Sequence, residues 1–324
     1  MKKSLIFSIS LLTLVCGLMG CKKTEKADDP RAKEVVIYTY DSFCGEWGAG
    51  PAIAELFEAK TGIKVTFAEC SGGQLVAKAV ADKSAPFADI AIGIDNNLFK
   101  QALDNDILME YKPASSSVLL DGLSEELNQG GKWLLTPYDY SHFAMIFDSK
   151  SDIPAPKSLE EMTLPVYKDK IILMANTSTV GLGFDNWVKA AYGDKADDYM
   201  KRLEPSVLTV APKWSAGYGM FTKGEAPLVI SYTTSPASHI EYGEGDQYKA
   251  LIFEEGHVRQ IEGAGILKSA PNVAGAKQFI DFLISEEAQN LIPLTQWMFP
   301  ANKDVKLPES YSLGAPVPEK TLKY

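Results

Sequence analysis

The first part of the chain alternates between the residue pattern of β-strands and that of amphipathic helices. Residues 35–40 and 63–68 are rich in β-branched and aromatic side chains, which is typical of strands. Between them, Pro51 and Gly62 bound a segment whose apolar residues fall on one helical face. A second such helix precedes an unbroken run of small apolar residues at 88–94, which predicts a buried parallel strand. This β-α-β-α-β order predicts a parallel, doubly wound α/β domain.

The buried strand at residues 88–94 ends in an acid, Asp95, which two asparagines follow. In open α/β sheets the ligand lies beyond the carboxyl ends of the strands, so Asp95 is placed to meet a cationic group. An aspartate at this position can equally cap the helix that begins after it. Both interpretations are consistent with the sequence around Asp95.

The middle of the chain predicts a second lobe. Two extended runs around Pro137, within residues 133–147, can carry the chain from one lobe to the other, and residues 258–266 would return it. Additional strands are predicted between these two crossings, at residues 170–174, 207–210 and 228–232. An amphipathic helix is predicted over residues 272–285.

The length of 324 residues also favours two lobes over one. We therefore expect an α/β protein with a ligand cleft between two lobes. Residues 35–137 and 258–324 would form the first lobe, and residues 138–257 the second.

The N-terminus has the pattern of an export signal. Lys2 and Lys3 precede an apolar core at residues 5–15, which is too short to span a membrane. The tetrad Leu-Met-Gly-Cys that follows resembles the lipobox of bacterial lipoproteins, in which the cysteine, here Cys21, is lipidated and becomes the first residue of the mature protein. We expect residues 1–20 to be removed and Cys21 to anchor the protein to a membrane. A plain signal peptide with an incidental cysteine is the weaker alternative.

Residues 21–34 are charged and almost without apolar side chains, so they predict a flexible tether between the lipid and the fold. Because the signal peptide carries Lys2 and Lys3, its removal would change the formal charge from −10 to −12. An acidic exported protein is a poor candidate for binding nucleic acid. No nucleic-acid partner is therefore expected.

Two of the four cysteines would remain free to form a bond with each other. Cys16 leaves with the signal peptide and Cys21 takes the lipid, which leaves Cys44 and Cys70. Each follows a predicted strand, and if these strands are neighbours the two sulfurs could come within bridging distance in an oxidising compartment. A disulfide and two free thiols are equally consistent with the sequence. No spacing of cysteine and histidine indicates a metal site.

A second candidate site follows the strand predicted at residues 170–174. Small hydroxyl and glycine residues at 176–183 lead into a helix predicted from Phe184. Free backbone N–H groups and the helix dipole at such a position favour phosphate or carboxylate, so Ser178 and Thr179 are candidates for anion binding. The segment lacks the spacing and the lysine of a P-loop. A simple N-cap with a tight turn is the equal alternative.

Aromatic residues recur at predicted strand ends and in loops. Each one alone is more often part of a core than of a site. Their recurrence together with Asp95 favours a flat, cationic ligand, because rings stack on rings and a cation over tryptophan or tyrosine gains about 1–2 kcal/mol. The residues are Tyr40, Trp47, Trp214, Tyr218, Tyr232 and Trp297.

Several segments, in order along the chain, resemble a known family. They are YTYDSF at residues 38–43, GIDNNL at 93–98, PYDY at 137–140, TSTVGLG at 177–183, WSAGYGMF at 214–221, KGEAPLVISYTTSPASHI at 223–240, EGH at 255–257 and QWMFP at 296–300. From Val35 to about Pro300 the chain resembles the periplasmic thiamine-binding proteins of bacterial thiamine ABC transporters, a family of extracellular solute-binding proteins. The resemblance implies a type II periplasmic-binding-protein fold, whose two α/β lobes close on thiamine, its monophosphate or its diphosphate.

The resemblance also implies roles for the candidate residues. Asp95 would meet the pyrimidine or the positive charge of thiamine. The rings that would stack on or enclose the ligand are those of Tyr40, Trp47, Tyr232 and Trp297. The hydroxyethyl or phosphate end would contact Ser178, Thr179 and Trp214, with Tyr218 and Asp41 as lesser candidates. The chain departs from the family at Cys44 and Gly45, where small or apolar residues are more usual, and in its expected lipid anchor, since the family is commonly soluble in the periplasm.

The expected function is capture of thiamine and its phosphates, and delivery to the permease subunits of an ABC importer, by a monomer that needs no cofactor and performs no chemistry. A polyamine or ferric-iron receptor of the same fold is the nearest alternative, although Tyr232 lacks the adjacent tyrosine that is typical of iron receptors. A thiaminase-like enzyme would need Cys44 or Cys70 as an activated nucleophile. An adhesive lipoprotein would be favoured by repeats and low-complexity stalks, and none is found in the sequence.

Overall fold

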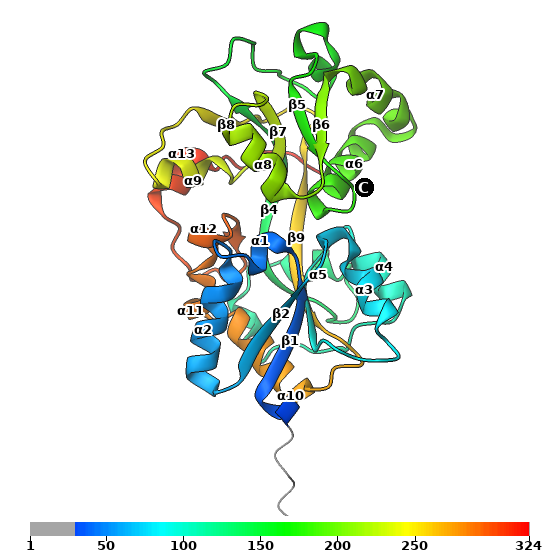
Figure 1. Ribbon diagram of the computed structural model, residues 1–324, viewed down its shortest axis with the longest axis vertical. Coiled ribbons are helices and arrows are strands. Elements are labelled where there is room, and N and C mark those ends of the chain that lie inside the picture. The colour runs from blue at the N-terminus through cyan, green and yellow to red at the C-terminus, as the bar shows by residue number, and fades with distance from the viewer. Residues whose placement is uncertain (1–29, 324) are drawn as a thin grey trace, which may run out of the picture.

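The structure is a computed structural model that describes residues 30–323. The predicted signal peptide, the lipidation site Cys21 and most of the tether lie outside these residues. Two α/β lobes are joined by two long strands, β4 (Thr136–Asp148) and β9 (His257–Ile266) (Figure 1). The prediction of a two-lobed α/β fold is confirmed.

The first lobe contains the predicted parallel β-α-β-α-β unit. Its three strands are β1 (Glu34–Thr39), β2 (Lys64–Glu69) and β3 (Ile90–Asp95), and β1 lies between the other two. Strand β9 pairs antiparallel with both β3 and β4, which gives the sheet order β2-β1-β3-β9-β4. The helices of this lobe are α1 (Asp41–Cys44), α2 (Ala49–Thr61), α3 (Leu75–Ala81), α4 (Phe99–Asp104), α5 (Leu123–Leu127), α10 (Val273–Leu283), α11 (Glu286–Gln289) and α12 (Ile292–Thr295).

The second lobe has a sheet that continues from the other half of β4. Strand β7 (Leu228–Tyr232) pairs antiparallel with β4 and parallel with β5 (Ile171–Met174), and β5 pairs with β6 (Val207–Ala211). A short strand, β8 (Tyr248–Ala250), also pairs with β4. The helices here are α6 (Thr179–Tyr192), α7 (Ala196–Leu203), α8 (Trp214–Thr222) and α9 (Pro236–Glu241).

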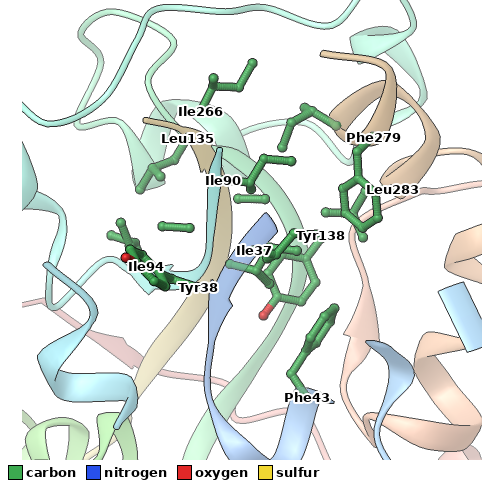
Figure 2. Close-up of a cluster of buried hydrophobic side chains, with 14 of the residues drawn as sticks. Ile37, Tyr38, Phe43, Ile90, Ile94, Leu135, Tyr138, Ile266, Phe279 and Leu283 are labelled. Carbon is green, nitrogen blue, oxygen red and sulfur yellow. The ribbon is translucent and has the colours of Figure 1, made fainter. Parts of the chain in front are cut away.

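The change from one lobe to the other occurs within β4 and β9. On β4, Tyr138 packs in the core of the first lobe and Phe143 in that of the second. On β9, Val258 belongs to the second core and Ile261 to the first. Each core is a separate cluster of apolar side chains, and Figure 2 shows Ile37 beside Tyr138, and Tyr38 beside Ile94, in the first. The expected crossing segments therefore form two strands that serve both lobes.

The C-terminal segment differs from the prediction, which assigned all of residues 258–324 to the first lobe. Helix α13 (Glu309–Gly314) packs against α9 of the second lobe, as Figure 1 shows. Strand β11 (Thr321–Leu322) then pairs with β9 beside His257. The short strand β10 (Phe299–Pro300) pairs with β4 just before this return. The tail has few apolar residues, and only the buried contacts of those few reveal where it lies.

Helix α6 begins earlier than expected, at Thr179 rather than near Phe184. The glycines in its first turns indicated a loop, but Gly183 serves close packing instead. A Cβ at Gly183 would lie 2.0 Å from the ring of Phe143 on β4. The helix can therefore approach the crossing strand only because this position has no side chain.

None of the helices between residues 30 and 323 is both long enough and apolar enough to cross a membrane.

Gly93 allows the Tyr40 ring to lie against β3. Gly93 has a φ of +99° at an irregularity in the pairing of β3 with β9, and a Cβ there would lie 2.3 Å from the Tyr40 ring. Gly122 has a φ of +84°, but a Cβ added there would meet no other atom within 4 Å. Both glycines have a conformation that strains other residues, and only Gly93 also has a steric reason to be glycine.

We expect Gly93→Ala to destabilise the protein more than Gly122→Ala. The positive φ costs each variant about 1–2 kcal/mol, and the clash with Tyr40 adds about 1–3 kcal/mol to the first. Urea unfolding of the two variants measures the difference. Equal loss of stability would show that the Tyr40 ring moves aside without cost.

Candidate functional site

A cavity of about 730 Å³ lies between the two lobes and is lined by residues of both. The carboxyl ends of β1, β2 and β7 open onto it through Tyr40, Cys70 and Tyr232. The predicted site residues that line it are Tyr40, Asp41, Trp47, Ser178, Thr179, Trp214, Tyr218, Tyr232 and Trp297. Of the predicted ligand-binding residues, only Asp95 does not line the cavity.

Asp95, which the sequence placed against the ligand, does not line the cavity. The side chain is completely buried. Its Oδ1 accepts hydrogen bonds from the backbone N–H groups of Asn97 and Leu98, both at 3.1 Å. Its Oδ2 accepts from Asn97 Nδ2 at 2.6 Å and from Gln260 Nε2 at 2.7 Å. Asp95 thus holds the turn that follows β3, which is close to the capping role that the sequence also allowed.

Glu262 on β9 is the buried acid that lines the cavity instead. It is 3% exposed, and its Oε2 accepts a hydrogen bond from the Tyr40 hydroxyl at 2.7 Å. The Tyr40 oxygen in turn lies 2.9 Å from that of Tyr138 and accepts from Gln296 Nε2 at 2.8 Å. A hydrogen-bonded chain therefore holds the carboxyl group of Glu262 at the cavity wall.

Burial raises the pKa of Glu262 to about 7, and the charge of Asp95 adds to this effect, while the hydrogen bond from Tyr40 opposes it. Asp139 lies directly opposite Glu262 on β4. Burial, followed by the charge of Glu262, raises the pKa of Asp139 well above its usual value. Neither Asp139 oxygen accepts a hydrogen bond from the described residues. Asp139 is therefore the weaker acid of the pair.

The sequence analysis missed Glu262. The only available signal was a single acid in the otherwise apolar and small run Ile-Glu-Gly-Ala-Gly-Ile at residues 261–266. An isolated acid in a buried strand is costly unless it is paired or functional. That signal marks the residue but does not show that it faces the cavity.

The aromatic side chains of the second lobe are held in place by neighbouring rings. Trp214 stacks on Tyr218 with ring centres 4.9 Å apart, and its Nε1 donates to Ser231 Oγ at 2.7 Å. Tyr232 stacks on Phe143 at 5.3 Å. Packing already fixes these rings, so binding of a flat ligand would cost little free energy for ordering the side chains.

Two tryptophans lie at the rim of the cavity. Trp47 lines the cavity and is 82% exposed. Trp297 has a φ of +56° and meets the ring of Tyr242 edge-on at 5.5 Å. A bulky residue rarely adopts a positive φ, and such strain often occurs at binding sites.

The predicted anion site lies where α6 begins. Ser178 Oγ accepts a hydrogen bond from the backbone N–H of Val180 at 3.2 Å, so Ser178 is the N-cap of the helix. Ser178 and Thr179 also line the cavity. Capping and cavity lining coexist here, because the start of the helix points into the cleft and its dipole favours an anion there.

The two lobes contact each other along the cleft. Lys213 Nζ lies 2.7 Å from Glu69 Oε1. Ser215 Oγ donates to Asp41 Oδ2 at 2.6 Å. The backbone N–H of Gly73 donates to Thr177 O at 3.1 Å. These bonds join the lobes in a closed arrangement.

Cys44 and Cys70 are free thiols in the structure, although their strands β1 and β2 are neighbours as expected. The disulfide that the sequence allowed is not formed. Burial raises the pKa of both thiols, that of Cys70 to about 11. A buried thiol with a raised pKa is a poor nucleophile, because little of it is thiolate at neutral pH.

We expect the ligand-free protein to be less stable at pH 8 than at pH 6. An acid whose pKa is raised by folding stabilises the fold below its unfolded pKa, and this contribution is lost as the pH rises through the folded value, here about 7. The loss from Glu262 between pH 6 and 8 is about 1 kcal/mol. Urea unfolding at the two pH values measures it.

Glu262→Gln should remove this difference, whereas Glu225→Gln at an exposed site should retain it. An unchanged pH dependence in Glu262→Gln would show that another group causes it.

Comparison with known proteins places the chain in a family. It matches the family described as bacterial extracellular solute-binding protein over residues 48–290. It is 40% identical over 318 residues to the thiamine-binding periplasmic protein of Brucella abortus biovar 1 (strain 9-941), covering 97% of this chain and 92% of that protein. It is 35% identical over 286 residues to the protein of the same name from Escherichia coli (strain K12), covering 86% and 84%.

The fold is similar to that of a solved periplasmic thiamin binding protein, with a TM-score of 0.82 and 33% identity over 90% of each chain. The family match extends over most of the chain, and the two relatives align with both lobes. The resemblance expected from the sequence is confirmed: the chain belongs to the bacterial extracellular solute-binding protein family.

Proposed function

We propose that this protein is the thiamine receptor of an ABC importer, which captures thiamine between its lobes and delivers it to a membrane permease. The observation that carries the proposal is a cavity lined by fixed aromatic rings, with a buried carboxyl group at its wall. Thiamine has two flat aromatic rings joined by a methylene group, and its thiazolium ring carries a permanent positive charge. The names of the relatives support the same ligand.

The rings of Trp214 and Tyr232 provide the stacking surfaces for the ligand. A cation over a desolvated tryptophan or tyrosine gains about 1–2 kcal/mol. Glu262 supplies the negative counter-charge that the sequence analysis assigned to Asp95, because Glu262 lines the cavity. Trp47 and Trp297 at the rim would cover the ligand once it is bound.

The start of α6 is suited to the phosphate groups of thiamine monophosphate and diphosphate. Ser178 and Thr179 offer hydroxyl groups there, and the helix dipole is favourable for an anion. The proposed ligand therefore lies with its rings near Trp214 and Tyr232 and its phosphate end at this helix.

The protein acts as a receptor and not as an enzyme in this proposal. The cavity's cysteine, Cys70, has a pKa of about 11, which argues against a nucleophile for thiamine breakdown. The signal-like N-terminus and the lipobox-like residues that end at Cys21 support export and anchoring to a membrane. The receptor acts as a monomer whose lobes close by a hinge motion at β4 and β9.

Replacing Trp214 or Tyr232 by alanine should weaken thiamine binding by about five- to thirtyfold, because each loss removes a stacking surface worth about 1–2 kcal/mol. Trp133→Ala is the matched control, since Trp133 packs on the first core outside the cavity. Isothermal calorimetry with thiamine measures all three. Unchanged affinity in both cavity variants would exclude these rings as the binding surface, and binding of spermidine in place of thiamine would favour a polyamine receptor.

Ser178→Ala should weaken binding of thiamine diphosphate by about tenfold or more, which is the value of a hydrogen bond to a charged group. The affinity for thiamine should change by less than about threefold. The variant also loses a helix cap, which costs about 1 kcal/mol of stability. Ser285→Ala controls for that loss, since Ser285 caps α11 away from the cavity. An equal effect on thiamine and its diphosphate would place the phosphate elsewhere.

A further inference from the structure

Three acidic side chains form a row across adjacent strands, and the middle one, Glu262, lines the cavity. Glu262 on β9 lies opposite Asp95 on β3 and opposite Asp139 on β4. Directly opposed residues of neighbouring strands have their side chains on the same face, and like charges there repel each other. All three side chains are buried. The row is therefore stable only if some of its charge is neutralised.

The three acids differ in how their charge is accommodated. Asp95 accepts four hydrogen bonds, which stabilise its ionised form. Asp139 accepts none from the described residues, so no hydrogen bond stabilises its ionised form. Glu262 lies between these extremes, with the Tyr40 hydroxyl as its donor and one side open to the cavity. Glu262 is the member of the row whose charge a bound molecule can change.

The groups that face Glu262 do not provide a positive charge. Asp95 lies on β3, Asp139 and Tyr138 lie on β4, and Tyr232 ends β7. Tyr40 directly follows β1. Arg259 lies on the same strand as Glu262, but its guanidinium pairs with Glu126. Within residues 30–323, the side chains that most influence the pKa of Glu262 are therefore acids and tyrosine hydroxyl groups, and burial acts on it more strongly than any of them. A cation in the cavity would supply the missing charge.

We propose that Glu262 is the cation-recognising residue of the cleft, and that binding of a cation releases to solvent the proton that Glu262 holds in the empty receptor. The inference rests on the proposed function, because it takes the thiazolium ring of thiamine as the cation. The step changes one carboxylic acid into a carboxylate and a free proton. No other bond forms or breaks. Asp139 keeps its own proton and donates it to the new carboxylate.

The coupling between cation binding and proton release at Glu262 fixes the direction in which affinity changes with pH. A cation stabilises the ionised form of Glu262, so its pKa is lower in the complex than in the empty protein, where it is about 7. Affinity then rises with pH up to about 7 and is constant above it. Between pH 6 and pH 8 the expected gain is about tenfold.

The test is a calorimetric titration of the mature protein with thiamine at pH 6 and pH 8, each in two buffers with different heats of ionisation. The difference in heat between the buffers counts the protons released. We expect release of most of one proton at pH 6 and almost none at pH 8. A neutral thiamine analogue with a thiophene ring in place of the thiazolium should bind without proton release and with the same affinity at both pH values.

Three variants assign the proton to a residue. Glu262→Gln should abolish the release and reduce the preference for thiamine over its neutral analogue. Asp139→Asn should retain the release, since an amide can replace the protonated acid as a donor to Glu262. His239→Gln tests the histidine that also lines the cavity; this variant should also retain the release.

The outcomes separate this inference from the proposed function. Thiamine bound with equal affinity at pH 6 and pH 8 and without proton release would overturn the inference alone. Release that is lost in His239→Gln or Asp139→Asn but kept in Glu262→Gln would also overturn it. Failure of thiamine to bind at either pH would overturn both. If Glu262→Gln does not fold, the two-buffer titration of the wild-type protein with thiamine and its neutral analogue still shows whether binding of the cation releases a proton.

Discussion

The pairing of β4 with β9 is the constraint on which the rest of the molecule depends. Both strands pass from one lobe to the other, so the two sheets and the two cores share a single pair of hydrogen-bonded strands. The cavity lies beside this crossing, and the register that sets Asp139 opposite Glu262 also sets the wall of the cavity. A shift of one residue would turn Glu262 to the other face of the sheet.

Buried acids at this crossing have a cost that packing alone does not explain. An ionised carboxylate away from water needs donors or a counter-charge. Asp95 has its donors within the fold, whereas Glu262 has one tyrosine hydroxyl and an open cavity. A site that is incomplete without a positive charge discriminates against neutral ligands, because they leave the carboxylate unpaired.

The remaining cavity walls are fixed before any ligand arrives. Trp214 and Tyr232 are stacked on other rings, and Gly93 and Gly183 allow close approach of Tyr40 and Phe143 to their neighbours. Contacts across the cleft, such as that between Lys213 and Glu69, then hold the lobes together. Recognition is thereby divided between a rigid set of rings and a hinge that lies in the two shared strands.

The sequence by itself determined the order and type of most elements, the existence of two lobes and the aromatic lining of the cleft. These features depend on local periodicity and on strand ends, which neighbouring residues encode. Only the tertiary structure decided that Glu262, and not Asp95, lines the cavity. It also decided that α6 begins early and that residues 309–322 return to the second lobe. The physical reason is that they depend on the register of strands far apart in the chain and on close packing at glycine, and neither leaves a periodic pattern in the sequence.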